Sequence, residues 1–220
     1  DFLARQTFDQ PISSAALHYA LGQDLISRQP GCEAHSVVAS AAAAGVPIYT
    51  SSPGDSSIGM NLAFHALLGD GGCAIDSNRD VNEVAAIILD GTRNGCLILG
   101  GGSPKNFYLQ GQPTLWEIYG IPKGGNEYFV QITTDQVVWG GLSGATPSEA
   151  VSWGKVNPGM LPDAVVAYSD ATIAFPILCE YVVGSEHGRR ERRGLVHRRD
   201  ALVAELERQA RARPRPSSDV

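Results

Sequence analysis

Apolar residues gather in short runs rich in valine and isoleucine, separated by longer segments in which apolar positions recur with helical spacing. The runs are bounded by glycine or proline, which is typical of buried strands. They predict strands at residues 46–50, 73–76, 96–99, 128–133 and 164–168.

The segments between these runs predict helices at residues 33–44, 58–68, 81–92 and 171–183, with an irregular helical stretch over 104–119. Before the first strand, Ser13 and Ser14 can cap a helix that continues to about Ile26, because a serine oxygen accepts from free amides of the first turn. Strands that alternate with helices require crossover connections. We therefore predict an α/β fold, with a Rossmann-like parallel sheet covered by helices on both faces.

A separate pattern occupies the end of the chain. Over residues 195–212, Leu195, Leu202 and Leu206 form one apolar stripe among arginines and glutamates, which predicts an amphipathic helix that ends before Pro214. Residues 184–194 are expected to form the joint between the main domain and this helix. The predicted organisation is a domain over 1–184 and a basic helix and tail over 185–220.

Charge changes this picture in one respect. Residues 185–220 hold ten arginines and six acids, whereas residues 1–184 hold seven basic and seventeen acidic residues. The acidic body disfavours nucleic acid and favours cationic ligands, although surface charge that keeps a protein in solution is by itself the better explanation. No apolar run approaches the roughly 20 residues of a membrane span, and residues 1–10 lack a secretory pattern, so we expect no membrane partner.

The four cysteines, Cys32, Cys73, Cys96 and Cys179, are far apart and form no C-x-x-C pair. This spacing argues against a zinc site and against a disulfide framework, and it indicates a reducing cytoplasm. Cys32 and His35 have ligand-like spacing, but no second pair completes a site. We therefore predict no metal.

Polar residues and glycines follow several predicted strands, at the place where parallel sheets bind ligands. After 46–50, Asp55 can accept from a sugar hydroxyl or an ammonium, in a loop that also offers serines as simple helix caps. After 96–99, three glycines at 100–102 let a pyrophosphate approach the backbone ahead of a helix; a tight turn without a ligand is the alternative.

Two further strand ends have the same character. Thr134 closes the strand at 128–133 and is followed by a glycine-rich loop that contains Ser143, and both suit either a nucleotide or an ordinary turn. Asp170 and Ala171 lie where the last strand meets a helix, and Asp170 can equally be a cap. Four polar strand ends in one sheet favour a nucleotide more than any single one does.

The most distinctive stretch is Glu149-Ala-Val-Ser-Trp-Gly-Lys155, because the chain has only three lysines: Lys105, Lys123 and Lys155. An aromatic wall such as Trp153 removes water from a lysine amine, which favours the neutral nucleophile needed for an imine. Alternatively, Trp153 stacks on a ligand cation with Glu149 as its counter-charge. An exposed lysine beside a core tryptophan is the simpler interpretation of this heptapeptide.

This heptapeptide resembles the active-site lysine motif of the deoxyhypusine synthase family, which includes homospermidine-forming bacterial relatives. Leu97-Ile-Leu-Gly-Gly-Gly102, the segment 46–59 and Tyr168-Ser-Asp-Ala-Thr-Ile-Ala-Phe-Pro176 resemble further family segments in the same order. The resemblance covers about residues 1–183, and several separated motifs in register make it specific.

The resemblance implies a cytoplasmic transferase that uses NAD to move the aminobutyl group of spermidine, through an imine on Lys155, to an acceptor amine. It also implies a homotetramer with sites at subunit interfaces. The implied polyamine-binding residues are Glu149, Trp153, Asn106 and Ser143. The implied NAD-binding residues are Asp55, Gly100, Gly101, Gly102, Thr134, Asp170 and Ala171.

This chain departs from the family pattern at positions that bear on the substrate. Some members of this family, the deoxyhypusine synthases, modify a lysine of a translation factor. Asn106 stands where those enzymes carry histidine, and Met60 and Leu142 stand where they carry acids. These changes predict a small diamine such as putrescine as acceptor, with a protein lysine as the alternative. Family chains also extend further at the amino end, so the sequence resembles a fragment, and a catalytically weak binding or structural subunit is the rival function.

Overall fold

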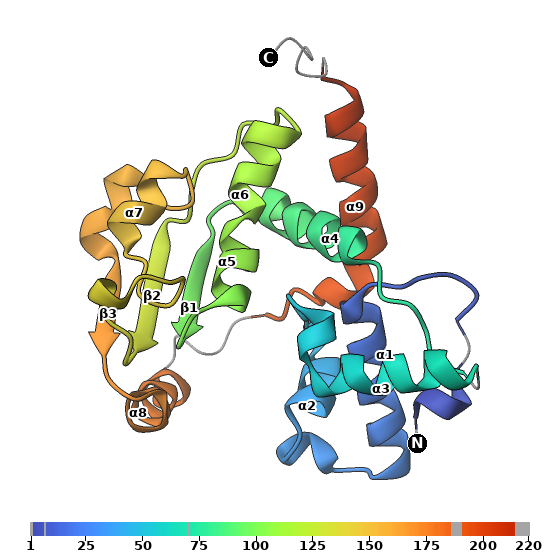
Figure 1. The fold of residues 1–220 in the computed structure, drawn as a ribbon. Coiled ribbons are helices and arrows are strands. Elements are labelled where there is room, and N and C mark those ends of the chain that lie inside the picture. The colour runs from blue at the N-terminus through green and yellow to red at the C-terminus, as the bar shows by residue number, and fades with distance from the viewer. Residues whose placement is uncertain (1, 7, 70, 186–190, 214–220) are drawn as a thin grey trace. The chain divides into compact units, whose positions relative to one another are not determined.

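The structure is a computed structural model, and it describes residues 2–6, 8–69, 71–185 and 191–213 (Figure 1). Two compact units make up this range. The first comprises the described residues of 1–83 and 192–203, and the second those of 84–191 and 204–220. None of the described helices is long and apolar enough to cross a membrane.

The first unit is helical. Its elements are η1 (Leu3–Arg5), α1 (Ser14–Arg28), η2 (Cys32–Ala34), α2 (Val37–Ala44), η3 (Pro53–Asp55), α3 (Ser57–Leu68) and the first parts of α4 (Ser77–Asp90) and α9 (Leu195–Arg211). The expected cap of α1 is confirmed, because Ser13 Oγ accepts from the amide of Ala16 at 3.2 Å. Helices α1 and α2 pack closely, since a Cβ on Gly22 would lie 2.5 Å from Ala42 Cβ.

The interior of this unit combines an apolar cluster with buried polar groups. Phe2, Leu17 and Leu62 form the centre of the cluster. Beside α1, the carboxylate of Asp80 accepts from the amide of Ser14 at 2.8 Å, and both residues are buried. Burial raises the pKa of Asp80.

Two predicted strands are wrong. Residues 46–50 form no strand, and the amide of Thr50 donates instead to Ser14 Oγ at 2.9 Å. Residues 73–76 contribute only an isolated bridge between Ile75 and Ile12. Apolar β-branched runs produce a strand only where a neighbouring backbone completes the ladder. Among the described residues, 46–50 has no such partner, and 73–76 pairs only with Ile12.

The second unit contains the predicted parallel sheet, which confirms the α/β class. Its strands are β1 (Gly95–Leu99), β2 (Tyr128–Thr133) and β3 (Val165–Tyr168), in the order β1-β2-β3. The three arrowheads in Figure 1 point the same way, so the carboxyl ends of the strands share one edge. The register pairs Leu99 with Ile132 and Thr133 with Tyr168 at that edge.

Helices cover one face of this sheet. Leu109 from α5 (Ser103–Leu109) and Ala150 from α7 (Pro147–Ser152) pack with Ile98 and Phe129 in a buried cluster. The remaining elements of the unit are the ends of α4 and α9, α6 (Gly111–Pro113), η4 (Thr114–Ile118), η5 (Val137–Trp139), η6 (Pro158–Asp163) and α8 (Ala171–Gly184). Helix α8 lies next to β2.

The C-terminal amphipathic helix is confirmed as α9. Its residues Leu202 and Leu206 are buried and Leu195 is half-buried, as the apolar stripe predicts. Residues 186–190 of the expected joint, and Pro214 with the tail after it, lie outside the described residues.

Candidate active site

Lys155 follows α7 directly, and the end of this helix determines its position. Thr146 Oγ1 caps α7 by accepting from the amide of Glu149 at 3.2 Å. At the other end, Gly154 turns the chain with a φ of +66°, and the amide of Lys155 donates to the carbonyl of Ala150 at 2.9 Å. A Cβ on Gly154 would lie 2.8 Å from Trp116 Nε1, so the position accepts only glycine without a shift.

The backbone of Lys155 is also held by a segment distant in sequence. Its carbonyl accepts from the amide of Asn126 and from Asn126 Nδ2, both at 2.9 Å. Asn126 is fully buried, and its Oδ1 accepts from the hydroxyl of Tyr108 at 2.9 Å. The lysine therefore projects from a rigid support, although no local pattern identifies Asn126.

The amine of Lys155 has the environment expected for a nucleophile. Nζ donates to Asn106 Oδ1 at 2.9 Å and lies 5.6 Å from the centre of the Trp153 ring. Partial burial lowers the pKa of Lys155, and the negative charge of Glu149 opposes this shift. The structure thus brings together Lys155, Trp153, Glu149 and Asn106. Of these, Asn106 and Lys155 are 49 residues apart in the sequence.

These four residues line a pocket of about 50 Å³ in the second unit, together with Lys105, Leu109, Leu142, Ala145, Thr146 and Ala150. Such a volume holds about one or two water molecules, so the pocket encloses only the reacting end of a ligand. Trp153, which is 61% exposed, offers a surface over which the rest of a ligand can extend.

Lys105 is a second lysine in this pocket, and its position differs from that of Lys155. It is buried, and Nζ donates to Gln131 Oε1 at 3.0 Å and to the carbonyl of Ala145 at 2.7 Å. Burial lowers its pKa, but two acceptors hold its protons. Lys155, with one such acceptor and a half-buried side chain, is the better nucleophile.

The glycine turn after β1 fits a phosphate-bearing cofactor. Gly100 and Gly102 have φ values of +75° and +76°, and a Cβ built on either would meet no atom within 4 Å. The backbone there faces open space into which a ligand can approach closely. Gly101 serves packing, because its Cβ would lie 2.6 Å from Ser143 Cα. This contact brings the predicted cofactor turn and the predicted substrate residue Ser143 together.

The other predicted cofactor residues divide between the two units. Thr134 follows β2, Asp170 lies between β3 and α8, and Ala171 is the first residue of α8, all at the same edge as the glycine turn. Asp170 also caps α8, accepting from the amide of Thr172 at 2.8 Å, and its hydrogen bonds with Thr172 lower its pKa. Asp55 belongs to the first unit, where it ends η3, and the neighbouring Ser56 caps α3.

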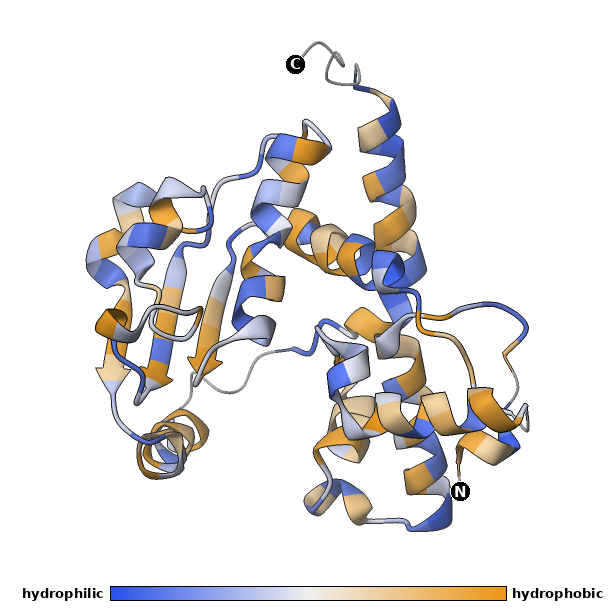
Figure 2. Cartoon of the chain, viewed as in Figure 1, coloured by the Kyte–Doolittle hydropathy of each residue, from blue (hydrophilic) through white to orange (hydrophobic). Residues whose placement is uncertain are grey.

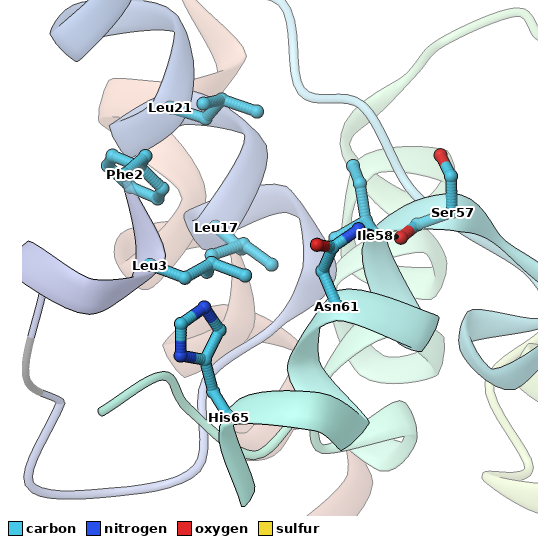
Figure 3. Close-up of a pocket in the computed structure, with 8 residues that line it drawn as sticks. All are labelled: Phe2, Leu3, Leu17, Leu21, Ser57, Ile58, Asn61 and His65. Carbon is cyan, nitrogen blue, oxygen red and sulfur yellow. Dashed lines mark hydrogen bonds between the residues drawn. The ribbon is translucent and has the colours of Figure 1, made fainter. Parts of the chain in front are cut away.

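A larger cavity, of about 240 Å³, lies in the first unit (Figure 3). Its walls are largely apolar, and the amide of Asn61 is already bound to the carbonyl of Ser57 at 2.8 Å. No predicted site residue lines it; the lining residues are Phe2, Leu3, Leu17, Leu21, Ser57, Ile58, Asn61 and His65. Glu149, Trp153 and Asn106, the residues predicted to bind a polyamine, line the pocket around Lys155 instead.

Metal chemistry has no support in the described part of the chain. No group of three or more metal-binding side chains occurs there, and all four cysteines are free. Cys96 has a pKa raised to about 12 by burial, so its thiol stays protonated.

Comparison with known proteins tests the resemblance. The chain matches the family described as deoxyhypusine synthase over residues 2–182. It is 45% identical to a deoxyhypusine synthase-like protein of Nostoc punctiforme, over 99% of this chain and 57% of that protein. The chain belongs to the deoxyhypusine synthase family.

Other members of the deoxyhypusine synthase family also match this chain over only part of their own length. A deoxyhypusine synthase-like protein of Thermosynechococcus vestitus is 47% identical over 93% of this chain and 53% of its own length. A probable deoxyhypusine synthase 2 of Methanosarcina acetivorans is 40% identical over 80% of this chain and 49% of its own. The chain therefore spans about half the length of the curated relatives that it matches.

The three departures from the family pattern have different surroundings. Asn106 accepts from Lys155, and Leu142 lines the same pocket, so both contact the space in which a substrate would react. Met60 lies on α3 in the first unit and is 65% exposed. Sequence reasoning missed Gln131 and Asn126, which bind the backbone around the site from β2 and from the segment before it.

Proposed function

We propose that this chain is the part of an aminobutyl transferase that carries the imine-forming lysine, and that spermidine is the donor. The observation that supports this most strongly is the amine of Lys155, partly buried, bound to Asn106 and lying over Trp153. An amine whose pKa is lowered by burial is neutral more often at a given pH, and only a neutral amine attacks carbon.

The proposed reaction uses this geometry. Lys155 Nζ attacks the carbon of the oxidised donor next to the secondary nitrogen, the bond from that carbon to diaminopropane breaks, and the aminobutyl group remains as an imine on Lys155. An acceptor amine then attacks the same carbon and releases Lys155. Asn106 Oδ1 holds Nζ in place, Trp153 shields the amine, and Glu149 offers a counter-charge to the cationic end of the donor.

The cofactor of this reaction would be NAD, on which the family generally depends. Gly100 and Gly102 would receive its phosphates, while Gly101 packs the turn against Ser143, and Thr134, Asp170 and Ala171 lie at the same sheet edge. Asp55, which belongs to the first unit, stays a predicted NAD contact. NAD would supply the hydride acceptor and later the hydride donor, so the net oxidation state of the polyamine is unchanged.

The acceptor that we propose is a small diamine such as putrescine, which would give homospermidine. Asn106 is neutral and Leu142 is apolar, so neither supplies the charge that would bind an additional ammonium. A buried charge contact to an amine is worth about 2 to 5 kcal/mol, enough to change which acceptor is preferred. The names of the archaeal relatives instead favour a protein lysine as acceptor.

We further propose that the protein forms a homo-oligomer, most simply a tetramer, in the cytoplasm. Helix α8 is largely hydrophobic (Figure 2). Its apolar side chains are exposed in the described chain, with Ile177 and Tyr181 each 69% exposed. On α3, Leu67 is 83% exposed. Surfaces of this kind are rare on monomers and support association. The free cysteines support a reducing compartment.

The test is incubation with NAD and spermidine, with putrescine and the translation factor both offered as acceptors at equal concentration, followed by borohydride reduction and mass analysis of products and peptides. We expect an aminobutyl adduct on Lys155 and, without borohydride, free homospermidine. Labelling of the translation factor without a free triamine would overturn the proposed acceptor. NAD binding without adduct or product would favour the rival function, a catalytically weak binding or structural subunit. Light scattering that gives an active monomer would overturn the tetramer.

A further inference from the structure

Gln131 is a polar residue at the centre of the sheet. It lies on the middle strand, β2, where its neighbours in register are Ile98 on β1 and Val166 on β3. Its exposed fraction is 1%. A buried amide on an apolar sheet destabilises the fold unless its donors and acceptor are all bound, so its partners indicate what it does.

The amide of Gln131 binds two loops at once. Nε2 donates to the carbonyl of Gly100 at 2.7 Å and to the carbonyl of Ser143 at 2.8 Å. Oε1 accepts from Lys105 Nζ at 3.0 Å. Because both loop partners are acceptors and Lys105 is a donor, only this orientation of the amide satisfies the network.

Lys105 extends the same network to a third carbonyl. Its Nζ also donates to the carbonyl of Ala145 at 2.7 Å, and it lies 5.7 Å from the centre of the Phe129 ring. The loop that contains Ser143 and Ala145 is therefore held at two carbonyls. A charged donor strengthens such bonds, and its burial makes their loss costly.

The loops that this network joins are those of the candidate site. Gly100 begins the turn proposed for the cofactor, whereas Ser143 and Ala145 belong to the loop beside Lys155. Their separation is small, since a Cβ on Gly101 would lie 2.6 Å from Ser143 Cα. The side chain of Gln131 bridges this separation, because its single amide nitrogen hydrogen-bonds a carbonyl of each loop.

We propose that Gln131 is a positioning residue that holds the glycine turn and the Ser143 loop at the separation the reaction requires, with Lys105 as its cationic anchor. This role rests on the proposed function. Gln131 touches neither substrate nor cofactor; it sets where the backbone of the cofactor turn lies relative to the pocket of Lys155. In this proposal Lys105 stabilises the structure of the site and does not form the imine.

The test compares Gln131→Met with a matched control, Gln112→Met, in the full chain. Gln112 is also fully buried in the second unit, and its amide has no hydrogen-bond partner among the described residues. For Gln131→Met we expect amide hydrogen exchange to rise about tenfold at residues 100–102 and 143–146, as for one lost buried hydrogen bond. We expect the NAD Kd and the spermidine KM to rise about tenfold as well, with kcat changed less than about threefold. Gln112→Met should change none of these quantities.

Two outcomes separate this proposal from the proposed function. Unchanged exchange at both loops in folded Gln131→Met overturns the positioning role, and so does faster exchange with unchanged Kd and KM. Failure of the wild-type chain to bind NAD or form an adduct overturns the proposed function, whatever the exchange shows. If Gln131→Met does not fold, Gln131→Glu replaces it, because it keeps the acceptor for Lys105 and removes the donors to Gly100 and Ser143.

Discussion

Replacement of Lys155 by arginine tests whether the site needs a nucleophilic amine or only a positive charge. Arginine retains a cation that can bind Asn106 and lie over Trp153, but its guanidinium does not deprotonate in proteins and forms no imine. We therefore expect NAD binding to persist and aminobutyl transfer to be lost.

The magnitudes follow from the contacts. The hydrogen bond to Asn106 and the contact with Trp153 are each worth about 1 kcal/mol, and arginine can retain both. The free energy of unfolding should therefore change by less than about 1 kcal/mol. Removal of the nucleophile should lower the rate at least about 10³-fold, the equivalent of about 4 kcal/mol in the barrier.

The assay is borohydride trapping with labelled spermidine and NAD, followed by peptide mass analysis, with urea unfolding in parallel. Lys123→Arg is the matched control, because Lys123 lies in the same unit, binds the backbone carbonyls of Leu89 and Gly91, and does not line the pocket. The control should trap as wild type does. Equal product from Lys155→Arg, or a wild-type adduct on Lys105, would refute the reasoning.

Three further predictions concern single side chains. Glu149→Gln removes the charge that raises the pKa of Lys155, so the pH midpoint of adduct trapping should move to lower pH; an unchanged midpoint would contradict this. Gly154→Ala places a Cβ at φ +66° and against Trp116, so urea unfolding should show a loss of about 1 to 2 kcal/mol, together with slower trapping. Asp80 has a raised pKa in the folded state, so ionisation costs stability as the pH rises above about 3.9, the unfolded value. Asp80→Asn does not ionise, and its free energy of unfolding relative to wild type should increase from pH 3 to pH 7 in chemical denaturation; a constant difference would exclude a raised pKa at Asp80.

Local sequence patterns identified most helices and three of the five predicted strands. The Ser13 cap, the stripe of α9 and the strand at Tyr128–Thr133 all depend on residues within one or two turns of each other. The same locality explains why Trp153 and Lys155 lie side by side, because one short helix and one glycine place them there. Asn106 came from family resemblance, because no periodicity relates it to Lys155.

Local patterns could not predict which distant segments pair with each other. The runs at 46–50 and 73–76 have strand-like composition, yet a strand exists only when a second backbone supplies its hydrogen bonds. Gln131 and Asn126 were missed for the same reason, since their importance comes from carbonyls 12 to 31 residues away. Composition and periodicity report which face of an element is apolar, whereas the partner of a buried polar group is chosen by the packed chain. Burial makes the partner important for stability, because an amide or ammonium removed from water must find its hydrogen bonds inside the protein.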